Sequence, residues 1–313
     1  MPHISVVIPV YKADSCLGEL YLRLKASLEM LTEDFEIVFV EDCGGDQSWP
    51  MIVDFSQRDL RVKGIQFSRN FGQHYGISAG LNHCDGDWVV VMDCDLQDRP
   101  EEIPRLYAKA LDGYDVVLAR RGRRKDSALK CATSWLFYKV FSYLADVNYD
   151  SQTGNFRIVS RKVVNNFCAM REQLRFFGGL VNWMGFPTAC IDVQHDERFD
   201  GQTSYTFRKL WKLANETIIA YSDKPLRLSI RFGFIVSAFA FAYGSYVIYL
   251  ALVYGKPIAG WSSLIASLYF LGGIIISILG ILGVYLGKTF DEAKHRPLYI
   301  INHTTFKDDH YKH

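Results

Sequence analysis

The chain has 313 residues, of which 49% are hydrophobic and 22% are charged, and its formal net charge is +1. The high apolar content and near-zero net charge exclude a chain that is disordered over most of its length. A balanced charge also argues against a general nucleic-acid-binding protein, which would usually be strongly basic. The length allows one large domain or two smaller ones.

Charge is distributed unevenly along the sequence. Between Phe232 and Gly287 the only charged residue is Lys256. The rest of the chain carries the charge that is usual for a soluble domain. The composition therefore predicts a soluble domain followed by a membrane segment.

From the N-terminus, short apolar segments alternate with segments of helical periodicity. The sequence predicts strands at 4–11, 35–40, 62–67, 87–92 and 114–118, and helices at 17–30, 47–60, 72–83 and 101–111. This alternation indicates parallel βαβ units, and nearly continuous apolar strands indicate a sheet that is covered on both faces. We therefore predict a doubly wound α/β domain with a mostly parallel sheet, whose ligands bind beyond the carboxyl ends of the strands.

Polar residues occur where these predicted strands end. Asp42 follows the second strand, Asp93 and Asp95 follow the fourth, and Arg120 and Arg121 follow the fifth. Because carboxyl ends of parallel strands meet at one edge of a sheet, these side chains are expected to gather there.

The segment Asp93-Cys94-Asp95 predicts a site for a divalent metal. Alternate residues of an extended chain point to the same side, and two adjacent carboxylates repel each other unless a cation lies between them. Oxygen ligands suit Mg²⁺ or Mn²⁺, which commonly bridge protein carboxylates to substrate phosphates, and Gln97 adds a carbonyl oxygen. A solvated turn can have the same sequence, so the interpretation depends on the preceding apolar strand.

A basic segment, residues 120–125, is predicted to lie in a loop. It contains Arg121 and Arg124, and guanidinium groups bind phosphate through paired hydrogen bonds. The segment could equally attract an anionic membrane surface, and a solvated surface loop is the alternative.

Two uncharged stretches, 232–255 and 257–287, each exceed the roughly 20 residues that span a hydrocarbon core. Basic residues lie on their outer flanks: Lys224, Arg227, Arg231, Lys288, Lys294 and Arg296. The positive-inside rule then places both ends of this hairpin in the cytoplasm. The preceding residues, 206–221, have helical periodicity with a basic start, typical of a helix on a membrane surface or of one packed on the domain.

These features divide the chain into four parts. They are a cytoplasmic catalytic domain (1–205), a juxtamembrane helix and linker (206–231), two transmembrane helices (232–287) and a cytoplasmic tail (288–313). The last dozen residues are polar and are expected to be loose. The seven cysteines include no C-x-x-C pair, and no signal peptide precedes them, so we expect reduced thiols.

Four segments together resemble a known family. They are 5–11 (SVVIPVY), 40–42 (VED), 67–72 (FSRNFG) and 92–98 (MDCDLQD). Their order and spacing are similar to those of the inverting family 2 glycosyltransferases with a nucleotide-sugar-binding (GT-A) fold. More narrowly, nearly the whole chain resembles the polyprenyl-phosphate glycosyltransferases, of the dolichol-phosphate mannose synthase and bactoprenol glucosyltransferase type.

The resemblance implies a role for individual residues. The donor would be bound by Pro9, Tyr11, Asp42, Arg69, Asn70, Asp93 and Gln97. A metal, Mg²⁺ or Mn²⁺, would be held by Asp93, Asp95 and Gln97. The catalytic set would be Asp93, Asp95, Arg121, Arg124 and Arg198. The acceptor would be bound by Arg124, Asn155, Arg198 and Thr203.

The sequence departs from the family pattern at three places. Tyr11 is followed by Lys-Ala-Asp instead of Asn-Glu-Glu, Ser204 replaces a common lysine, and the common G-D-F-R is G-N-F-R, with Asn155 in place of the carboxylate. An alcohol acceptor needs a general base, whereas a lipid monophosphate is already anionic at neutral pH. Asn155 therefore fits a phosphate acceptor better.

The residues and the resemblance together predict a metal-dependent glycosyltransferase. It would transfer a sugar, with inversion, from a nucleotide sugar to polyprenyl phosphate at the cytoplasmic membrane face. The resemblance favours a UDP-sugar over a GDP-sugar and allows a homo-oligomer in contact with membrane lipids. A transferase acting on another lipid or a polysaccharide is one alternative, although the Q-x-x-R-W motif of processive synthases is absent. An inactive nucleotide-sugar-binding membrane scaffold is the other. No nucleic-acid partner is expected.

Overall fold

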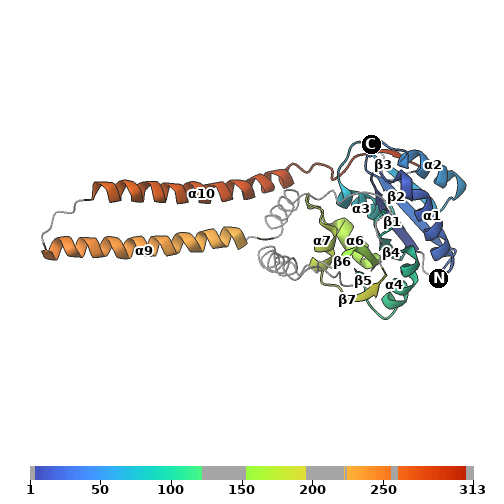
Figure 1. Cartoon of the computed structure of the whole chain (residues 1–313), viewed down its shortest axis with the longest axis horizontal. Helices are drawn as coiled ribbons and strands as arrows, with labels where there is room; N and C mark the ends of the chain where they lie inside the picture. Colours follow the sequence, from blue (N-terminus) through green and yellow to red (C-terminus); the bar gives the residue numbers. More distant parts are fainter. Residues whose placement is uncertain (1–3, 122–152, 195–221, 223, 255–259, 308–313) are drawn as a thin grey trace. The chain divides into compact units, whose positions relative to one another are not determined.

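The computed structural model describes residues 4–121, 153–194, 222, 224–254 and 260–307. These form two compact units. One unit contains a β-sheet with helices on both of its faces and includes residues 296–307, and the other contains two long helices (Figure 1).

The elements of the first unit agree with the predicted ones to within a few residues as far as residue 118. The strands are β1 (Ile4–Val10), β2 (Phe35–Glu41), β3 (Val62–Phe67), β4 (Trp88–Val91), β5 (Val116–Arg121), β6 (Thr153–Ser160), β7 (Thr188–Val193) and β8 (Ile301–Thr304). The helices are α1 (Asp14–Glu29), α2 (Ser48–Arg58), α3 (Gln73–Asn82), the 3₁₀ helix η1 (Pro100–Glu102), α4 (Ile103–Ala110), α6 (Arg161–Ala169) and α7 (Phe177–Trp183). The sequence had predicted nothing for β6, α6, α7 and β7.

The strands form one eight-stranded sheet in the order β7-β5-β6-β4-β1-β2-β3-β8. Four pairs are parallel: β1 with β2, β1 with β4, β2 with β3, and β5 with β7. Strand β6 runs antiparallel between β4 and β5, and β8 runs antiparallel to β3. The predicted mostly parallel α/β fold is confirmed.

The two faces of β1 pack against different helices, as its buried position in the sheet requires. Val6 and its alternate neighbours belong to the core cluster with α1, α2 and α4. Val7 and Pro9 point to the other face, where Gly80 and Gly76 of α3 lie directly over them. A Cβ atom on Gly76 would come within 3.1 Å of Pro9 Cβ, so the glycines allow α3 to approach the sheet closely.

Arg175 is the main polar group inside this unit, with only 2% of its surface exposed. Its guanidinium donates to Ser78 Oγ (3.1 Å), to the Met170 carbonyl (2.8 Å) and to the Phe167 carbonyl (3.1 Å). It also lies 4.0 Å from the centre of the Phe167 ring. Arg175 therefore joins α3 to the end of α6, an arrangement that no local sequence pattern predicts.

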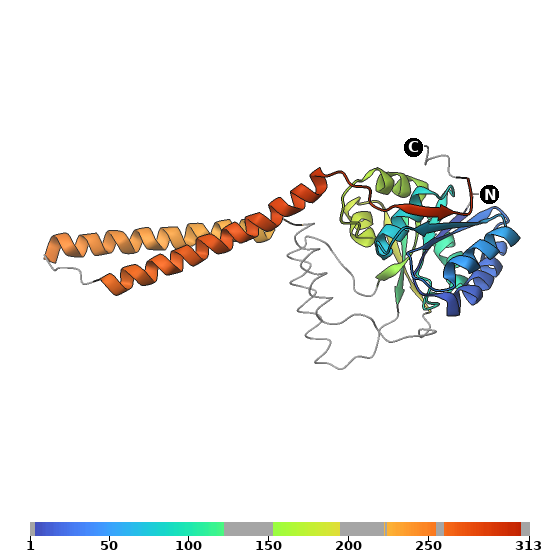
Figure 2. The same ribbon diagram turned by 90° about the horizontal axis from the view of Figure 1, so that it is seen from above.

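The C-terminal segment also returns to the sheet. Residues Ile301–Thr304 form β8, the edge strand next to β3, in Figure 2 the red arrow beside the sheet. The expectation of a loose C-terminus is therefore wrong for this segment. A short polar strand gives little apolar signal, because its pairing depends on β3, far away in the sequence.

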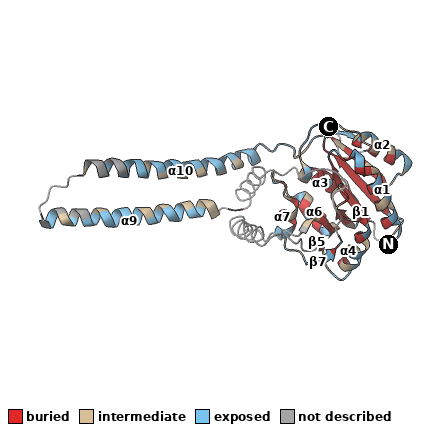
Figure 3. Ribbon diagram, viewed as in Figure 1, coloured by how far each residue is buried: buried red, intermediate tan, exposed pale blue. Residues whose placement is uncertain are grey.

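The second unit contains α9 (Lys224–Tyr254) and α10 (Trp261–Ala293). Both are long and apolar enough to cross a membrane, over Lys224–Tyr246 and Ser267–Ala293. Their described side chains are largely exposed, whereas the central strands of the sheet, such as β1 and β2, are buried (Figure 3). Helix α9 already begins at Lys224, so the predicted linker ends earlier than residue 231.

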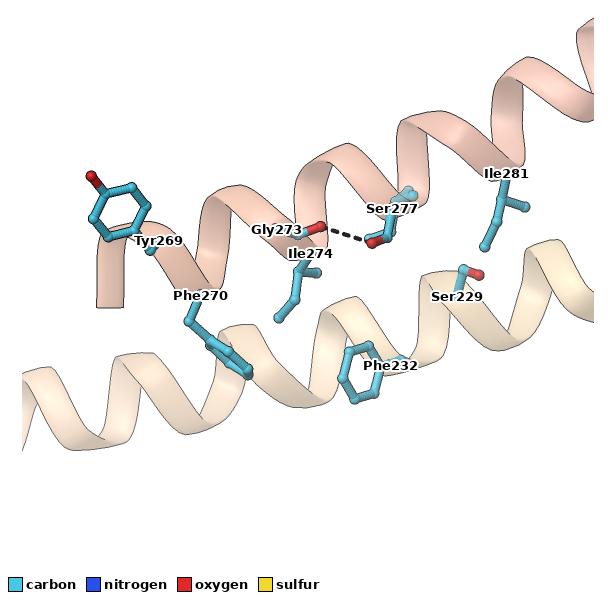
Figure 4. A pocket seen from close by; sticks show the side chains of 9 residues that line it. Ser229, Phe232, Tyr269, Phe270, Gly273, Ile274, Ser277 and Ile281 are labelled. Carbon is cyan, nitrogen blue, oxygen red and sulfur yellow. Dashed lines mark hydrogen bonds between the residues drawn. The ribbon is translucent and has the colours of Figure 1, made fainter. Parts of the chain in front are cut away.

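An apolar groove of about 490 Å³ lies between α9 and α10. Figure 4 shows Phe232 on one helix and Phe270, Ile274 and Ile281 on the other along this groove. The hydroxyl of Ser277 donates to the Gly273 carbonyl of its own helix (2.8 Å), so it presents no unsatisfied polar group. The surface is suited to hydrocarbon.

Replacing the buried arginine tests its role in joining α3 and α6. Arg175→Ala removes the guanidinium donor from the Ser78 hydroxyl and the Met170 carbonyl, and leaves the Phe167 carbonyl only the Met170 amide, so the unfolding free energy should fall by about 3 kcal/mol. The thermal midpoint of the full chain in detergent should then drop by about 6–12 °C. Arg171→Ala, on the exposed part of the same connection, is the control and should leave the midpoint unchanged. Equal midpoints for both variants would contradict this role.

Candidate active site

The predicted site residues come from one edge of the sheet. Tyr11 follows β1, Asp42 follows β2 and Asp93 comes two residues after β4. Strand β5 runs in the same direction as β4, and its last residues are Arg120 and Arg121. These two arginines were predicted to follow the strand in a loop, and that expectation is wrong, although they still lie at the same edge.

Asp42 fixes the loop that precedes α3. Its carboxylate is buried, and it accepts hydrogen bonds from the backbone amides of Phe71 (2.7 Å) and Gly72 (2.8 Å). Gly72 has a φ of 105°, a conformation that favours glycine, so the amides are turned towards the carboxylate by the backbone itself. Burial raises the pKa of Asp42 even though the two amides oppose this effect. The charged carboxylate is therefore held at some cost in stability at neutral pH.

Asp93 is held in place by two side-chain amides. Gln73 Nε2 donates to Asp93 Oδ1 at 2.6 Å, and Asn155 Nδ2 donates to the same oxygen at 3.2 Å. Gln73 is the first residue of α3, and Asn155 lies near the start of β6. Both amides stabilise the charged form of the carboxylate and fix the direction in which it points.

Asn155 reaches Asp93 because β6 is antiparallel to β4. The pairing of Val91 with Arg157, continued by two residues, brings Asn155 opposite Asp93. Arg157 is buried and secures the start of β6 by donating to the carbonyls of Asn155 (3.2 Å) and Gly154 (2.6 Å). The sequence had singled out Asn155 only through its family position, and it had missed Gln73 and Arg157.

Asp93 and Asp95 stand on either side of Cys94 in the sequence, and this cysteine is half-buried. Cys16 Sγ donates to the Cys94 carbonyl (3.1 Å), and burial raises the pKa of Cys94 to about 12, so this thiol stays neutral. Asp95 Oδ1 accepts from the Gln97 backbone amide at 3.2 Å, which closes a turn after the strand. Within the described part of the chain, no disulfide joins Cys16, Cys43, Cys84, Cys94, Cys168 or Cys190.

Backbone strain is concentrated at this edge. Lys12, Cys43 and Leu96 have positive φ values of 52°, 53° and 59°, and they follow β1, β2 and β4 respectively. Each such residue costs about 1–3 kcal/mol and persists only when its surroundings enforce it. Strain of this kind is typical of a functional site.

The other residues that were predicted to bind the nucleotide-sugar donor differ in their exposure to solvent. Tyr11 is 48% exposed and offers an aromatic face at the edge of the site. Arg69 and Asn70 are exposed, with the Arg69 guanidinium 4.0 Å from the centre of the Phe71 ring. Pro9 is buried in β1 under α3, so it contributes packing below the site.

The residues of the β4 turn have the chemistry of a divalent metal site. Two half-buried carboxylates and an amide oxygen at Gln97 are hard ligands of the kind that Mg²⁺ and Mn²⁺ prefer. Among the described residues, no three His, Cys, Asp or Glu side chains are grouped so as to hold a metal. An ion at Asp93 and Asp95 would therefore complete its shell with oxygens from a substrate or water.

His74 is a further residue that the sequence did not indicate. Its Nδ1 atom is buried and has no hydrogen-bond partner among the residues that the structure describes, and its ring meets Phe176 edge to face at 5.4 Å. Burial, together with the charge of Arg157, lowers the pKa of His74 to about 4, so the ring is neutral at physiological pH. Arg124, Arg198 and Thr203, and the side chain of Arg121, lie outside the described part of the chain.

Comparison with known proteins agrees with this geometry. The family model described as glycosyl transferase family 2 matches residues 5–171, which include Asp42, Asp93, Asp95 and Asn155. The chain belongs to this family. It is thus a glycosyltransferase, and the resemblance noted from its motifs is confirmed.

Relatives match over almost the full length. The glycosyltransferase YkcC of Bacillus subtilis is 39% identical, with 98% of this chain and 97% of that protein covered. The bactoprenol glucosyl transferase of Shigella phage SfV is 37% identical, with 95% of this chain and 97% of that protein covered. A solved structure with a similar fold is that of glucosyl-3-phosphoglycerate synthase from Mycobacterium tuberculosis, in complex with Mn²⁺, UDP and phosphoglyceric acid. Its TM-score is 0.52 at 14% sequence identity, and the match covers 70% of this chain and 77% of that protein's chain. It supports the GT-A fold.

The role of Asp42 can be tested without any ligand. Asp42→Asn keeps the shape of the side chain, but its single carbonyl oxygen can accept a hydrogen bond from only one of the two backbone amides. The Phe71 and Gly72 amides should therefore exchange hydrogen about 10- to 100-fold faster. Global stability should change little, because the variant also loses the buried charge. Hydrogen exchange measured by mass spectrometry reports both effects. Asp54→Asn, at an exposed ion pair with Arg58, is the control, and unchanged exchange in Asp42→Asn would contradict the assignment.

Proposed function

We propose that this protein transfers a sugar from a nucleotide-sugar donor to polyprenyl phosphate at the cytoplasmic membrane face, with inversion and with the help of a divalent metal. The observation that carries the proposal is Asp93, held by Gln73 and Asn155 beside Asp95 at the edge of the sheet. Full-length similarity to a bactoprenol glucosyl transferase supports the acceptor class.

In this proposal, Asp93, Asp95 and Gln97 hold Mg²⁺ or Mn²⁺ against the donor diphosphate. The ion, when bound, supplies positive charge that stabilises the leaving diphosphate. The chain itself holds the Asp93 carboxylate in position, because the side-chain amides of Gln73 and Asn155 both donate to its Oδ1 atom.

The nucleotide would lie across the ends of β1 and β2. Tyr11 offers an exposed ring for stacking, and Asp42 holds the loop that contains Arg69 and Asn70. A cationic side chain near a diphosphate provides charge-assisted hydrogen bonds. We favour a uridine diphosphate sugar, on the resemblance of the motifs.

The acceptor in this proposal needs no general base. A phosphate oxygen attacks the anomeric carbon while the bond from that carbon to the diphosphate breaks, so the electron pair leaves with the nucleotide. Asn155 is an amide and His74 is neutral with a pKa of about 4, and neither is required to remove a proton from a phosphate dianion. The task of the site is then to position both substrates and to stabilise the diphosphate.

The membrane arrangement is part of the same proposal. Helices α9 and α10 cross the bilayer, and the sheet domain, residues 1–205 with 296–307, lies in the cytoplasm. Lys224, Arg227 and Arg231 near the start of α9, with Lys288 and Lys294 near the end of α10, support this orientation. The apolar groove between the helices is compatible with a prenyl chain.

Carboxylate substitutions test the metal site. Asp93→Asn and Asp95→Asn should each lower sugar transfer by at least about 10²–10³-fold, because each removes charge that holds the metal on the diphosphate. Turnover is measured in membranes supplied with polyprenyl phosphate, a panel of nucleotide sugars, and Mg²⁺ or Mn²⁺ at increasing concentration.

Asp112→Asn is the matched control, since Asp112, just beyond the C-terminal end of α4, forms an exposed ion pair with Lys109. It should retain full activity and the same metal requirement. Full activity in both Asp93→Asn and Asp95→Asn would refute the metal assignment. Nucleotide-sugar binding without turnover on any lipid would favour a scaffold.

The pH dependence tests the proposed nucleophile. The second pKa of a phosphate monoester is near 6, so the reactive dianion increases as the pH rises. The rate at low acceptor concentration should rise about tenfold per pH unit below 6 and level off above 7. A phosphonate acceptor, whose second pKa is higher, should shift the curve to higher pH by the difference between the two pKa values. A curve that is identical for both acceptors would indicate a protein base instead.

A further inference from the structure

We propose that the segment after the second long helix, residues 296–303, is a positioning element of the donor site, with Tyr299 as its central residue. It supports the loop at 68–72, which contains Arg69 and Asn70. This inference rests on the proposed function only where it concerns the donor. The mechanical support of the loop can be tested without any substrate.

The first contact is between backbones. Ser68, the residue directly after β3, donates its amide to the Ile300 carbonyl at 3.0 Å. Strand β8 continues this pairing with Phe67 opposite Ile301 and Gln66 opposite His303, with an irregularity between Gln66 and Phe67. The start of the loop is therefore hydrogen-bonded to the C-terminal segment.

The second contact is a column of rings. The Tyr299 ring stacks on Phe67, with centroids 5.2 Å apart and planes at 21°. Phe67 meets Phe71 edge to face at 5.5 Å, and the Arg69 guanidinium lies 4.0 Å from the centre of the Phe71 ring. Aromatic pairs of this kind fix relative orientation as well as adding apolar contact. The column extends from Tyr299 to the cationic side chain of the loop.

Tyr299 is itself held by α3. Asn82 Nδ2, at the end of that helix, donates to Tyr299 Oη at 3.0 Å and to the Ser78 carbonyl at 2.9 Å. At the opposite end of the helix, Gly72 and Gln73 border the site. Tyr299 is thus fixed to α3, and the first residue of that helix, Gln73, donates one of the two amide hydrogen bonds to Asp93.

A second link joins the segment to α3. Gln173 Nε2 donates to the Arg296 carbonyl at 2.9 Å, and Tyr75 Oη donates to the Gln173 carbonyl at 2.7 Å.

Taken together, the contacts hold the loop from two sides, by Asp42 through the Phe71 and Gly72 amides and by Tyr299 through the Phe67 ring. Because Tyr299 follows α10 in the sequence, this second support exists only in a chain that includes the helical hairpin and its C-terminal continuation.

The two ends of β8 provide a matched pair of variants. Tyr299 precedes the strand and contacts the loop side, whereas Phe306 follows it and lies near His83 (6.1 Å) and Lys63 (5.7 Å), at the far end of β3. Both are half-buried aromatic residues of the C-terminal part of the chain, but Phe306 lies outside the proposed positioning element. Tyr299→Ala and Phe306→Ala in the full chain therefore remove similar packing at different distances from the loop.

Hydrogen exchange of residues 68–72 in the absence of ligand is the first measurement. Tyr299→Ala should speed exchange about 3- to 10-fold, the range expected for loss of one aromatic pair, while Phe306→Ala leaves it unchanged. Tyr299→Phe keeps the stacked ring and should remain close to the natural protein. Equal exchange in Tyr299→Ala and Phe306→Ala, or no change in either, would overturn the inference.

Kinetics of the full chain in membranes is the second measurement. Tyr299→Ala should raise KM for the nucleotide sugar about 3- to 10-fold, with kcat and the acceptor KM changed less than twofold. A merely structural role would instead lower the amount of active protein, and hence the maximal rate per total protein, in both alanine variants. If the natural protein turns over no donor, the proposed function fails, whereas the exchange measurement still decides whether Tyr299 supports the loop.

Discussion

The antiparallel pairing of β6 between β4 and β5 is the constraint on which the site depends. It brings the start of β6 to the edge where β4 ends, so that Asn155 and Asp93 meet at 3.2 Å. The same pairing buries Arg157, which holds the backbone of that start through two carbonyls. With β6 parallel instead, its first residues would lie at the opposite edge, and Asp93 would lose one of its two amide donors.

Buried polar groups differ between the two ends of the strands, the end at the site and the end away from it. At the edge away from the site, Glu36 is buried and accepts from Ser5 Oγ (2.5 Å) and the Asp85 amide (2.6 Å), and it pairs with Lys63 (2.6 Å). Such a saturated group contributes to a defined structure. At the site edge, Asp93 and Asp95 are only half-buried, and they lie close to residues with positive φ.

The sequence predicted what depends on local pattern. Strands β1 to β4 are nearly continuous apolar runs, and Asp42, Asp93 and Asp95 come within four residues of the ends of two of them, so the pattern alone predicted where these residues lie. It did not predict β6, the two amides on Asp93, the buried Arg175 or β8. Each of these depends on a partner far away in the sequence, such as the Phe67–Tyr299 stack, and Ile-Asn-His-Thr has no pattern of its own.

The mass of the lipid product tests the central claim most directly. Membranes containing the full chain are given a nucleotide sugar, a divalent metal and either polyprenyl phosphate or the corresponding polyprenol. Our account predicts a product heavier than polyprenyl phosphate by one sugar residue, with release of nucleoside diphosphate, and no product from the alcohol. Glycosylated polyprenol, or no glycolipid from polyprenyl phosphate with any nucleotide sugar, would contradict it.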